Sequence, residues 1–476
     1  MALQTNWLGM QINLNRTPLN QASAARGRTF GIVACGRPAS GVNAAIASAV
    51  REIYQSGNNA VGFADGMKGI MNGNAIVLSP HLVSGISAKG GVAIGTSKLN
   101  LKDKAGLMKE KLEQYGISGL IAICGTETGT AMGKLAETGF PVITVPKSMH
   151  NNIPGTEMSI GFRTAANAAT TQLRAIKESA RSNNGTNLYI AEFGGLYSSA
   201  LTLSAGNSAE ATAVFIPEEC TLDGIRQIVS HSFPNRDYIL DRIAKTLTVR
   251  GEILNTANFL RMIEDDQIAE DDIVLDLPSV ANAIAGIMYA RKGVHISYGI
   301  FPVSQGIARK FMFDPYTFRK DDRKPDSFQV LGLEQSCFVK ADEHGKPRYA
   351  DVDAGSSLLT LTRNAMNGLN MPARVSLFTL EAGFDTLDPV FADTELGKAL
   401  GYRAAERLLN GNSGEMVSVG TKGNIGTVPL SAMPIDYRGV FRPRPVDLTE
   451  AVYEESVSSQ RWKSSPAMDV SPVEVE

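Results

Sequence analysis

The chain has 476 residues, of which 43% are hydrophobic and 20% are charged, and its formal net charge is −2. This length predicts two or three domains, and the composition is that of a globular protein rather than a disordered or fibrous one. A nearly neutral chain gives no electrostatic reason to expect nucleic acid or an acidic membrane as a partner, so small molecules or proteins are favoured.

No apolar run approaches the roughly 20 residues that span a bilayer, and the first residues lack the basic and apolar segments of a signal peptide. We therefore expect a cytoplasmic protein. The four cysteines form no C-x-x-C pair and the histidines have no metal-binding spacing, so neither a metal site nor a disulfide framework is predicted. Buried, reduced thiols are the expected state.

Residues 1–27 are polar and lack periodicity, which predicts an N-terminal extension that is either flexible or laid on a neighbouring surface. The fold is expected to start at Arg28, with a strand over Thr29–Ala34, a turn containing Gly36, and a helix with apolar residues at helical spacing. Such a unit can hold a phosphate on the free N–H groups at the helix N-terminus. An ordinary glycine turn explains the same pattern.

The central stretch Leu120–Gly161 predicts a buried strand, a glycine-containing turn, a short helix, a second strand and a polar loop. Because loops at the carboxyl ends of parallel strands line the ligand crevice, its two loops are expected to face one site. The candidate residues on these loops are Gly125, Thr126, Glu127, Thr128, Lys147, His150 and Asn152.

Strands and helices alternate up to residue 230, which predicts a doubly wound parallel sheet. This part includes a long helix over Phe162–Ser182 and strands over Asn187–Phe193 and Ala213–Ile216. Residues 302–372 contain alternating segments around the sequence HGKP and predict an inserted β-hairpin. An amphipathic helix ending at Gly411 follows, and the last segment starts as a helix and ends as an acidic Ser/Pro tail.

Three motifs of the chain resemble those of one enzyme family. GIVACGRPASGVNAAI is similar to that family's G-G-D-x-P-G-M-N-A-A loop, and GGVAIGTSK to its G-G-T-x-L-G-[ST]-x-R segment. GFPVITVPKSMHNNIPGTEMSIGFRTA resembles the region that contains the family's P-K-T-I-D-N-D sequence. The chain thus resembles the phosphofructokinase superfamily over residues 28–230 and 373–420, which implies two Rossmann-like α/β domains with sugar and phosphoryl sites between them.

The resemblance also implies a domain organisation. A phosphoryl-donor-side domain is expected over residues 28–160, and a sugar-phosphate-side domain over residues 161–301 and 373–420. Residues 302–372 are then an insertion, and residues 421–476 a C-terminal extension and tail. Because subunits of the family complete each other's sites, a homo-oligomer is implied.

Several residues that carry the family's chemistry are replaced here. Thr126 stands where the family has the Asp that serves Mg²⁺, His150 where it has the general base, and Asn152 where it has a second Asp. Phosphoryl transfer needs metal and cationic groups to neutralise the transferring oxygens, so metal affinity is expected to fall severely. A histidine can still act as a base on geometry alone, which leaves the role of His150 open.

Phosphate contacts are implied for a set of residues on the donor side. They are Gly36, Arg37, Lys98, Gly125, Glu127, Thr128 and Lys147. In the family, a lysine at the position of Lys147 and an acidic residue at that of Glu127 mark the pyrophosphate-dependent branch. Arg37 either contacts a ligand or fills the space where a ligand would lie.

On the sugar side, the implied site residues are Gly194, Glu218 and Thr379. Glu218 matches a glutamate that contacts sugar hydroxyls. Thr379 and Ala382 replace the His and the Arg that grip the sugar phosphate in the family. Each lost charged hydrogen bond should cost about 1.5–3 kcal/mol, so binding of a phosphate dianion is expected to weaken by several kcal/mol.

These replacements favour a divergent homologue that is not an efficient 6-phosphofructokinase and has a regulatory or assembly role as a homo-oligomer. The alternative is an active pyrophosphate-dependent phosphotransferase, or another phosphate-handling enzyme, on a different substrate. It would use His150 as base, with Lys147, Lys98 and Arg37 on the phosphate. Mg²⁺ and pyrophosphate, with a sugar phosphate or similar ligand, are expected only in that case. A filament or scaffold subunit and an ordinary phosphofructokinase remain open.

Overall fold

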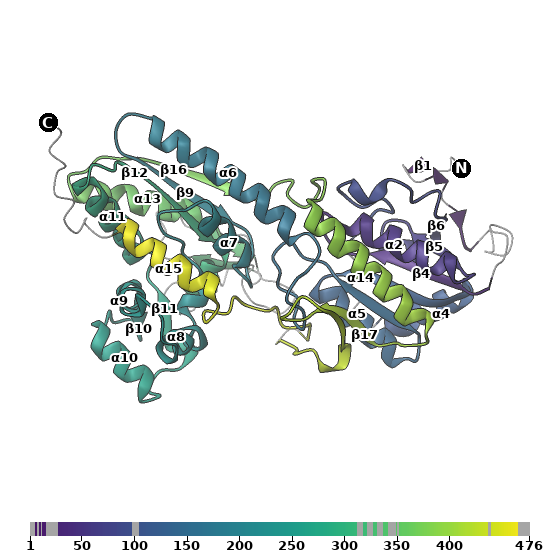
Figure 1. Ribbon diagram of the computed structural model, residues 1–476. Coiled ribbons are helices and arrows are strands. Elements are labelled where there is room, and N and C mark those ends of the chain that lie inside the picture. The colour runs from purple at the N-terminus through teal and green to yellow at the C-terminus, as the bar shows by residue number, and fades with distance from the viewer. Residues whose placement is uncertain are drawn as a thin grey trace. The chain divides into compact units, whose positions relative to one another are not determined.

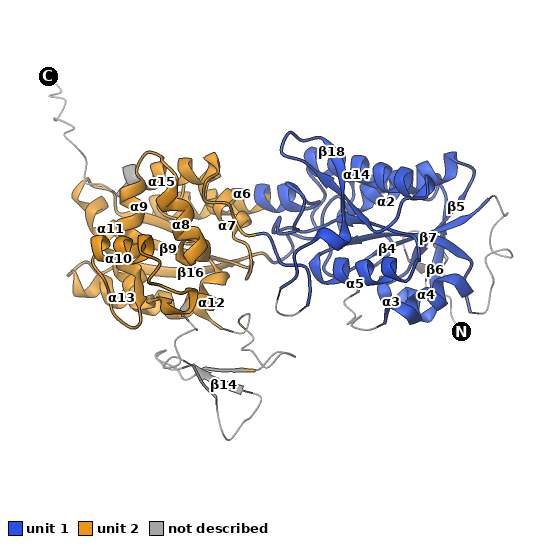
Figure 2. Ribbon diagram, turned by 90° about the horizontal axis from the view of Figure 1, so that it is seen from below, with its two compact units in different colours: residues 1–167, 382–444 blue, residues 168–381, 445–476 orange. Residues whose placement is uncertain are grey.

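The computed structural model describes residues 5–6, 9–10, 12–15, 27–97, 104–311, 318–320, 327–330, 337–340, 349, 352–436 and 439–464. It divides into two compact units, which Figure 2 shows in different colours. The first unit comprises residues 1–167 and 382–444, and the second comprises residues 168–381 and 445–476. Both are α/β structures with their own buried cores.

The first unit is built on an eight-stranded sheet in the order β18-β17-β8-β7-β4-β5-β6-β3. Its five central strands run parallel and are β4 (Thr29–Ala34), β5 (Asn59–Phe63), β7 (Ile117–Cys124), β8 (Val142–Pro146) and β17 (Glu415–Val419). Its antiparallel edge strands are β18 (Ile425–Pro429), β6 (Asn74–Leu78) and β3 (Ile12–Asn13). The central strands β4, β7 and β8 are almost continuous buried apolar runs, as expected for strands covered on both faces.

Helices cover both faces of this sheet, as Figure 2 shows. One face carries α2 (Val42–Gln55) and α14 (Phe391–Leu409), and the other carries α3 (Met67–Asn72), α4 (Ala105–Gln114) and α5 (Thr126–Glu137). Glycines allow α14 to lie close to α2, because a Cβ on Gly401 would lie only 2.2 Å from the main-chain oxygen of Ala45.

The division of the chain differs from the domain boundaries expected from the sequence. Residues 373–420 were expected in the second domain, but α14 and β17 belong to the first unit. The physical reason is that α14 packs on α2, and β17 extends the parallel sheet beside β8. α6 (Phe162–Ser182) begins in the first unit and continues in the second.

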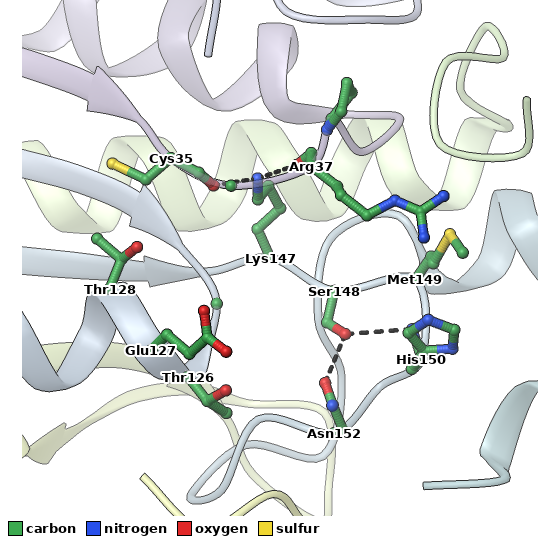
Figure 3. Close-up of a pocket in the computed structure, with 13 residues that line it drawn as sticks. Cys35, Arg37, Thr126, Glu127, Thr128, Lys147, Ser148, Met149, His150 and Asn152 are labelled. Carbon is green, nitrogen blue, oxygen red and sulfur yellow. Dashed lines mark hydrogen bonds between the residues drawn. The ribbon is translucent and has the colours of Figure 1, made fainter. Parts of the chain in front are cut away.

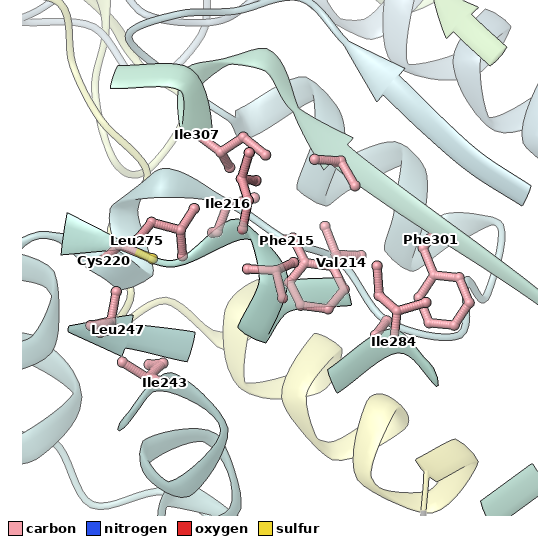
Figure 4. Packing of buried hydrophobic residues seen from close by; sticks show 14 of the residues in the cluster. Val214, Phe215, Ile216, Cys220, Ile243, Leu247, Leu275, Ile284, Phe301 and Ile307 are labelled. Atoms are coloured by element: carbon pink, nitrogen blue, oxygen red, sulfur yellow. The ribbon is translucent and has the colours of Figure 1, made fainter. Parts of the chain in front are cut away.

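The second unit contains a parallel sheet in the order β12-β9-β16, formed by β12 (Tyr298–Ser304), β9 (Asn187–Phe193) and β16 (Arg374–Leu380). The helices that pack against it are α7 (Ala200–Ser208), α11 (Leu277–Gly293) and α13 (Ala354–Gly368). The unit also contains α8 (Leu222–Ser230), α9 (Arg236–Thr246), α10 (Thr256–Glu264), α15 (Ala451–Ser464) and the antiparallel pair β10 (Leu247–Val249) and β11 (Ile273–Leu275). Figure 4 shows part of its apolar core, and Figure 1 labels most of these elements.

The strand expected over Ala213–Ile216 is not a regular strand. Phe215 forms an isolated parallel bridge with Val303 of β12. Pro302 of β12 has no N–H group to donate to this segment, and Ile300 donates to the hydroxyl of Thr212 instead of to its main chain. The segment therefore lies along β12 without a continuous ladder.

The N-terminal extension and the insertion are described in part. Residues 12–15 lie on the sheet edge, where β3 pairs with β6 and Leu14 is buried. The insertion contains the antiparallel strands β13 (Phe318–Lys320), β14 (Ser327–Val330) and β15 (Cys337–Lys340). These strands precede the HGKP sequence, which lies outside the described residues.

Cys35, Cys124 and Cys220 are buried and free, as expected, and the side chain of Cys337 lies outside the described part. Within the described ranges, every helix is too short or too polar to cross a bilayer.

Candidate functional site

A pocket of about 200 Å³ lies in the first unit where three neighbouring parallel strands end (Figure 3). The turn after β4, the turn between β7 and α5, and the loop after β8 meet there, as expected at the carboxyl edge of a parallel sheet. The lining residues are Cys35, Gly36, Arg37, Pro38, Gly125, Thr126, Glu127, Thr128, Lys147, Ser148, Met149, His150 and Asn152. The pocket thus brings together the donor-side candidates except Lys98, which lies outside the described residues.

Lys147 follows β8 directly, and only 4% of this residue is exposed. Its main-chain N–H donates to the carbonyl of Cys124 at the end of β7, at 3.0 Å. Its ammonium group donates to the main-chain carbonyls of Cys35 and Arg37 in the turn after β4. Burial lowers the pKa of Lys147 from 10.5 to about 8, so the side chain is mostly charged at pH 7. Two of its three N–H groups hold the protein's own backbone.

Arg37 is the more accessible cation of the pocket, with 52% of its side chain exposed. Its Nε lies 3.3 Å from Oδ2 of Asp385, and Figure 3 shows its side chain reaching toward the loop that carries His150. Burial, with the charge of Arg37 as a smaller cause, lowers the pKa of His150 from 6.5 to about 4. His150 is therefore neutral at pH 7, and it is a weaker base than an ordinary histidine.

The loop that carries His150 is held by its own polar side chains. Ser148 Oγ donates to Asn152 Oδ1 at 2.6 Å and accepts from the main-chain N–H of His150 at 3.2 Å. Asn151 has a left-handed backbone, with φ 50°, and its side chain donates to the carbonyl of Glu157 at 2.9 Å. The amide oxygen of Asn152 is thus engaged inside the loop.

The residues of the pocket fit a Mg²⁺ ion poorly. Glu127 is the one carboxylate of the lining and is exposed, while Thr126 offers a neutral hydroxyl. In the part of the chain that the structure describes, no group of three or more His, Cys, Asp or Glu residues could hold a metal. Magnesium at phosphate sites is held by carboxylates together with phosphate oxygens, and this pocket supplies few of the former.

The N-terminus of α5 is the part of the pocket that suits an anion. Gly125 precedes the helix in an extended conformation, and no side chain caps the first turn. The free N–H groups of a first turn attract negative charge. The carboxylate of Glu127 lies in the same turn and competes with a bound anion for these N–H groups.

Asp385 and Arg444 contribute to this site from segments where the sequence showed no candidate. Asp385 pairs with Arg37. Arg444 donates from its main-chain N–H to the carbonyl of Asn152 at 2.9 Å and from its guanidinium to Glu157 Oε2 at 2.7 Å. No local pattern marks either residue, and only the placement of residues 382–444 in the first unit could have indicated them.

The sugar-side candidates lie in the second unit. Gly194 follows β9 and lies against a carboxylate, because a Cβ on Gly194 would be 2.0 Å from Oε1 of Glu381. Thr379 lies on β16 and is exposed. The neighbourhood of Gly194 therefore contains an acidic group, which opposes the binding of a phosphate dianion.

Glu218 is buried, with 6% exposed, and one oxygen of its carboxylate is occupied by main-chain donors. Oε1 accepts from the N–H of Ser199 at 2.9 Å and from the N–H of Val446 at 3.3 Å. Ser199 is the N-cap of α7, where a carboxylate is electrostatically favourable.

Comparison with known proteins identifies similar sequences and folds. The family model described as phosphofructokinase matches residues 29–275, more than half of the chain. The chain is 33% identical over 193 residues to ATP-dependent 6-phosphofructokinase 2 of Streptomyces coelicolor, and 33% identical over 195 residues to the ATP-dependent 6-phosphofructokinase of Bacillus cereus strain ATCC 14579. Each match covers 40% of this chain, and 56% and 60% of the two relatives, so the similarity spans little more than half of their length.

Two solved structures share the fold. Phosphofructokinase from Saccharomyces cerevisiae superposes with a TM-score of 0.61 at 16% identity, over 92% of this chain and 48% of that chain. A pyrophosphate-dependent phosphofructokinase from Marinobacter aquaeolei superposes with a TM-score of 0.56 at 12% identity, over 92% of each chain. At these identities the likeness shows the α/β fold.

Proposed function

The chain belongs to the phosphofructokinase family, and we propose that it is a divergent member that phosphorylates fructose 6-phosphate poorly or not at all. Its role in this proposal is regulation or assembly, as a homo-oligomer. The observation that carries the proposal is the Lys147 ammonium group, which donates to the backbone carbonyls of Cys35 and Arg37. A lysine held in this way stabilises the turn after β4 and has a single N–H group left for a phosphate oxygen.

The other groups of the pocket support the same conclusion. Catalysis of phosphoryl transfer depends on positive charge around the transferring oxygens. Here Arg37 shares its charge with Asp385, and His150 is neutral. Glu127 places a negative charge in the first turn of α5. The net charge of the pocket is therefore weakly positive at most.

The second unit supports it as well. The carboxylate of Glu381 lies beside Gly194, and Glu218 receives two main-chain N–H groups. By resemblance, these positions belong to the sugar-phosphate side of the family. The Glu381 carboxylate there opposes the binding of a phosphate dianion.

A second candidate is supported by the pocket itself. Its volume of about 200 Å³ lies below the ~300–1,000 Å³ of ordinary ligand pockets, which suits a pyrophosphate-sized group better than a nucleotide. A pyrophosphate-dependent phosphotransferase or another phosphate-handling enzyme would use Arg37 and the α5 N-terminus to bind phosphate, and neutral His150 to accept a proton from the acceptor hydroxyl.

A turnover assay separates the two functions. The full chain is incubated with Mg²⁺, pyrophosphate or ATP, and a panel of sugar phosphates, beside the variant His150→Ala and a control, His81→Ala, an exposed histidine outside the pocket. We expect the wild type to show no turnover above that of His150→Ala. Turnover that His150→Ala abolishes and His81→Ala preserves would contradict the proposal and support the second candidate.

Two physical measurements complete the test. A bound ligand raises the melting temperature by mass action, so we expect millimolar pyrophosphate to leave it unchanged. Light scattering after size exclusion tests the proposed homo-oligomer. A monomer at micromolar concentration would contradict an assembly role, and very large particles would favour a filament or scaffold subunit.

A further inference from the structure

Residues 445–460, here called the C-terminal segment, pack one side against the hydrophobic core of the second unit. Leu448, Tyr453 and Val457 are at most 1% exposed and belong to its hydrophobic core. The segment consists of an extended stretch followed by α15. It lies beyond residue 275, where the match to the family model ends.

A buried ion pair holds α15 in place. Glu219 pairs with Arg242, and both residues are more than nine-tenths buried. Tyr453 of α15 donates its hydroxyl to Glu219 Oε1 at 2.9 Å, and Arg242 donates to Gln460 Oε1 at 2.6 Å. Undocking α15 would remove both hydrogen bonds from a buried ion pair, so the helix is expected to stay docked.

The extended stretch before α15 binds through its main chain. The N–H of Leu448 donates to Gln227 Oε1 at 3.0 Å, and the N–H of Val446 donates to Glu218 Oε1 at 3.3 Å. Val446 and Leu448 lie on either side of Asp447. Their two hydrogen bonds hold the backbone of the stretch against α8 and the residues before it.

Glu218 lies at the buried N-terminus of α7, here called the polar site, because its Oε1 accepts from the N–H of Ser199, the N-cap of that helix. Three oxygens of these residues and of α7 are also buried and have no hydrogen-bond partner among the described residues: Glu218 Oε2, and on α7 and its N-cap Thr202 Oγ1 and Ser199 Oγ. Ser199 and Thr202 are three residues apart at the start of α7, so they share one face of that helix. A carboxylate and two hydroxyls at a helix N-terminus are groups that could bind a polar molecule if they were accessible.

We propose that the C-terminal segment is the permanent, built-in occupant of this polar site. The Val446 N–H takes the place of a donor from an external ligand, and α15 fixes it there, so Glu218 is closed to substrates. The inference rests on the proposed function, because an enzyme that binds its substrate through Glu218 would need this carboxylate to be accessible.

Amide hydrogen exchange of the full chain tests this directly. We expect the Val446 amide to exchange about 100-fold or more slowly than in an unfolded peptide of the same sequence. Glu218→Ala should accelerate exchange at both Val446 and Ser199 by about tenfold or more, whereas Glu218→Gln, which keeps an acceptor oxygen, should preserve much of the protection. Glu264→Ala, an exposed carboxylate on α10, serves as the control and should change neither amide.

The measurement on the wild type does not depend on whether a variant folds. A Val446 amide that exchanges as fast as in a peptide overturns the proposal, and so does a folded Glu218→Ala variant with unchanged exchange at Val446. Millimolar fructose 6-phosphate should leave this amide unaffected, and a change above roughly twofold would mean competition for Glu218 and would also overturn it. Turnover with a protected Val446 amide would contradict the proposed function alone, whereas an unprotected amide in an inactive protein would overturn this inference alone.

Discussion

Lys147 donates a hydrogen bond from its ammonium group to the main-chain carbonyl of Cys35, two strands away in the order β8-β7-β4. The main-chain N–H of Lys147 also donates to the carbonyl of Cys124, at the end of the intervening strand β7. One residue thus joins the carboxyl ends of three neighbouring strands. The pocket beside it is shaped by a lysine that acts first as a structural tie.

The burial of Lys147 predicts that the stability of the protein depends on pH in the alkaline range. Because the pKa of Lys147 is about 8 in the folded protein and 10.5 in the unfolded chain, the unfolded chain binds more protons between these values. The contribution of Lys147 to the free energy of unfolding therefore rises with pH across this window, by at most roughly 3 kcal/mol. Lys147→Met should lack the rise. Urea unfolding at pH 7.5 and pH 10 measures it, with the exposed Lys422→Met as control. A difference between wild type and Lys147→Met that is the same at both pH values would contradict the burial of this charge.

His150 is expected to titrate well below an ordinary histidine. NMR titration should give a pKa near 4, and Arg37→Gln should raise it but leave it below 6.5, because burial is the larger cause. Arg28→Gln, outside the pocket, should have no effect. As pH falls below 6.5 the unfolded chain takes up the proton first, so His150 makes the fold progressively less stable down to about pH 4. A pKa of 6.5 or above would restore His150 as an ordinary base.

Asp393 is expected to be a main determinant of stability in the first unit. It is fully buried on α14 and accepts from the main-chain N–H groups of Gly161 and Thr164 and from the Thr164 hydroxyl, at 2.7 to 3.2 Å. These donors lie at the N-terminus of α6. Asp393→Ala should lower the free energy of unfolding by about 2–4 kcal/mol, since it removes a cap and leaves buried donors unpaired. Thr164→Val, which loses the hydroxyl that donates to Asp393 and accepts from the Val390 N–H, should cost less, about 1–2 kcal/mol. Equal losses in urea unfolding would contradict this assignment.

Glu192 predicts an opposite pH dependence in the second unit. It is a buried residue of β9, and burial, followed by the charge of Asp353, raises its pKa from 4.5 to about 7. The folded protein then binds more protons than the unfolded chain between these values, so this contribution to stability is lost as pH rises through the window. The free energy of unfolding of Glu192→Gln, taken relative to wild type, should increase by up to about 3 kcal/mol between pH 5 and pH 8. Asp353→Asn can still cap α13, and it should lower the pKa of Glu192 and so narrow the pH range over which stability is lost. A gain that is independent of pH would show that Glu192 is ionised throughout.

The sequence alone was sufficient for the elements whose signals are local. The strands β4 and β9 and the helix α6 have the predicted bounds, because a buried apolar run and a 3.6-residue spacing are properties of consecutive residues. The convergence of the donor-side turns on one pocket was also predictable, since parallel strands end at one edge.

Only the tertiary structure decided what the side chains of the site do. Lys147 and Cys35 are separated by 112 residues, and Arg37 and Asp385 by 348 residues. Whether a lysine is free for a phosphate or tied to a carbonyl, and whether a glutamate is open or covered by Val446, depends on which groups the fold brings beside it. Burial and pairing are properties of spatial neighbours, and a residue type at a motif position does not specify them.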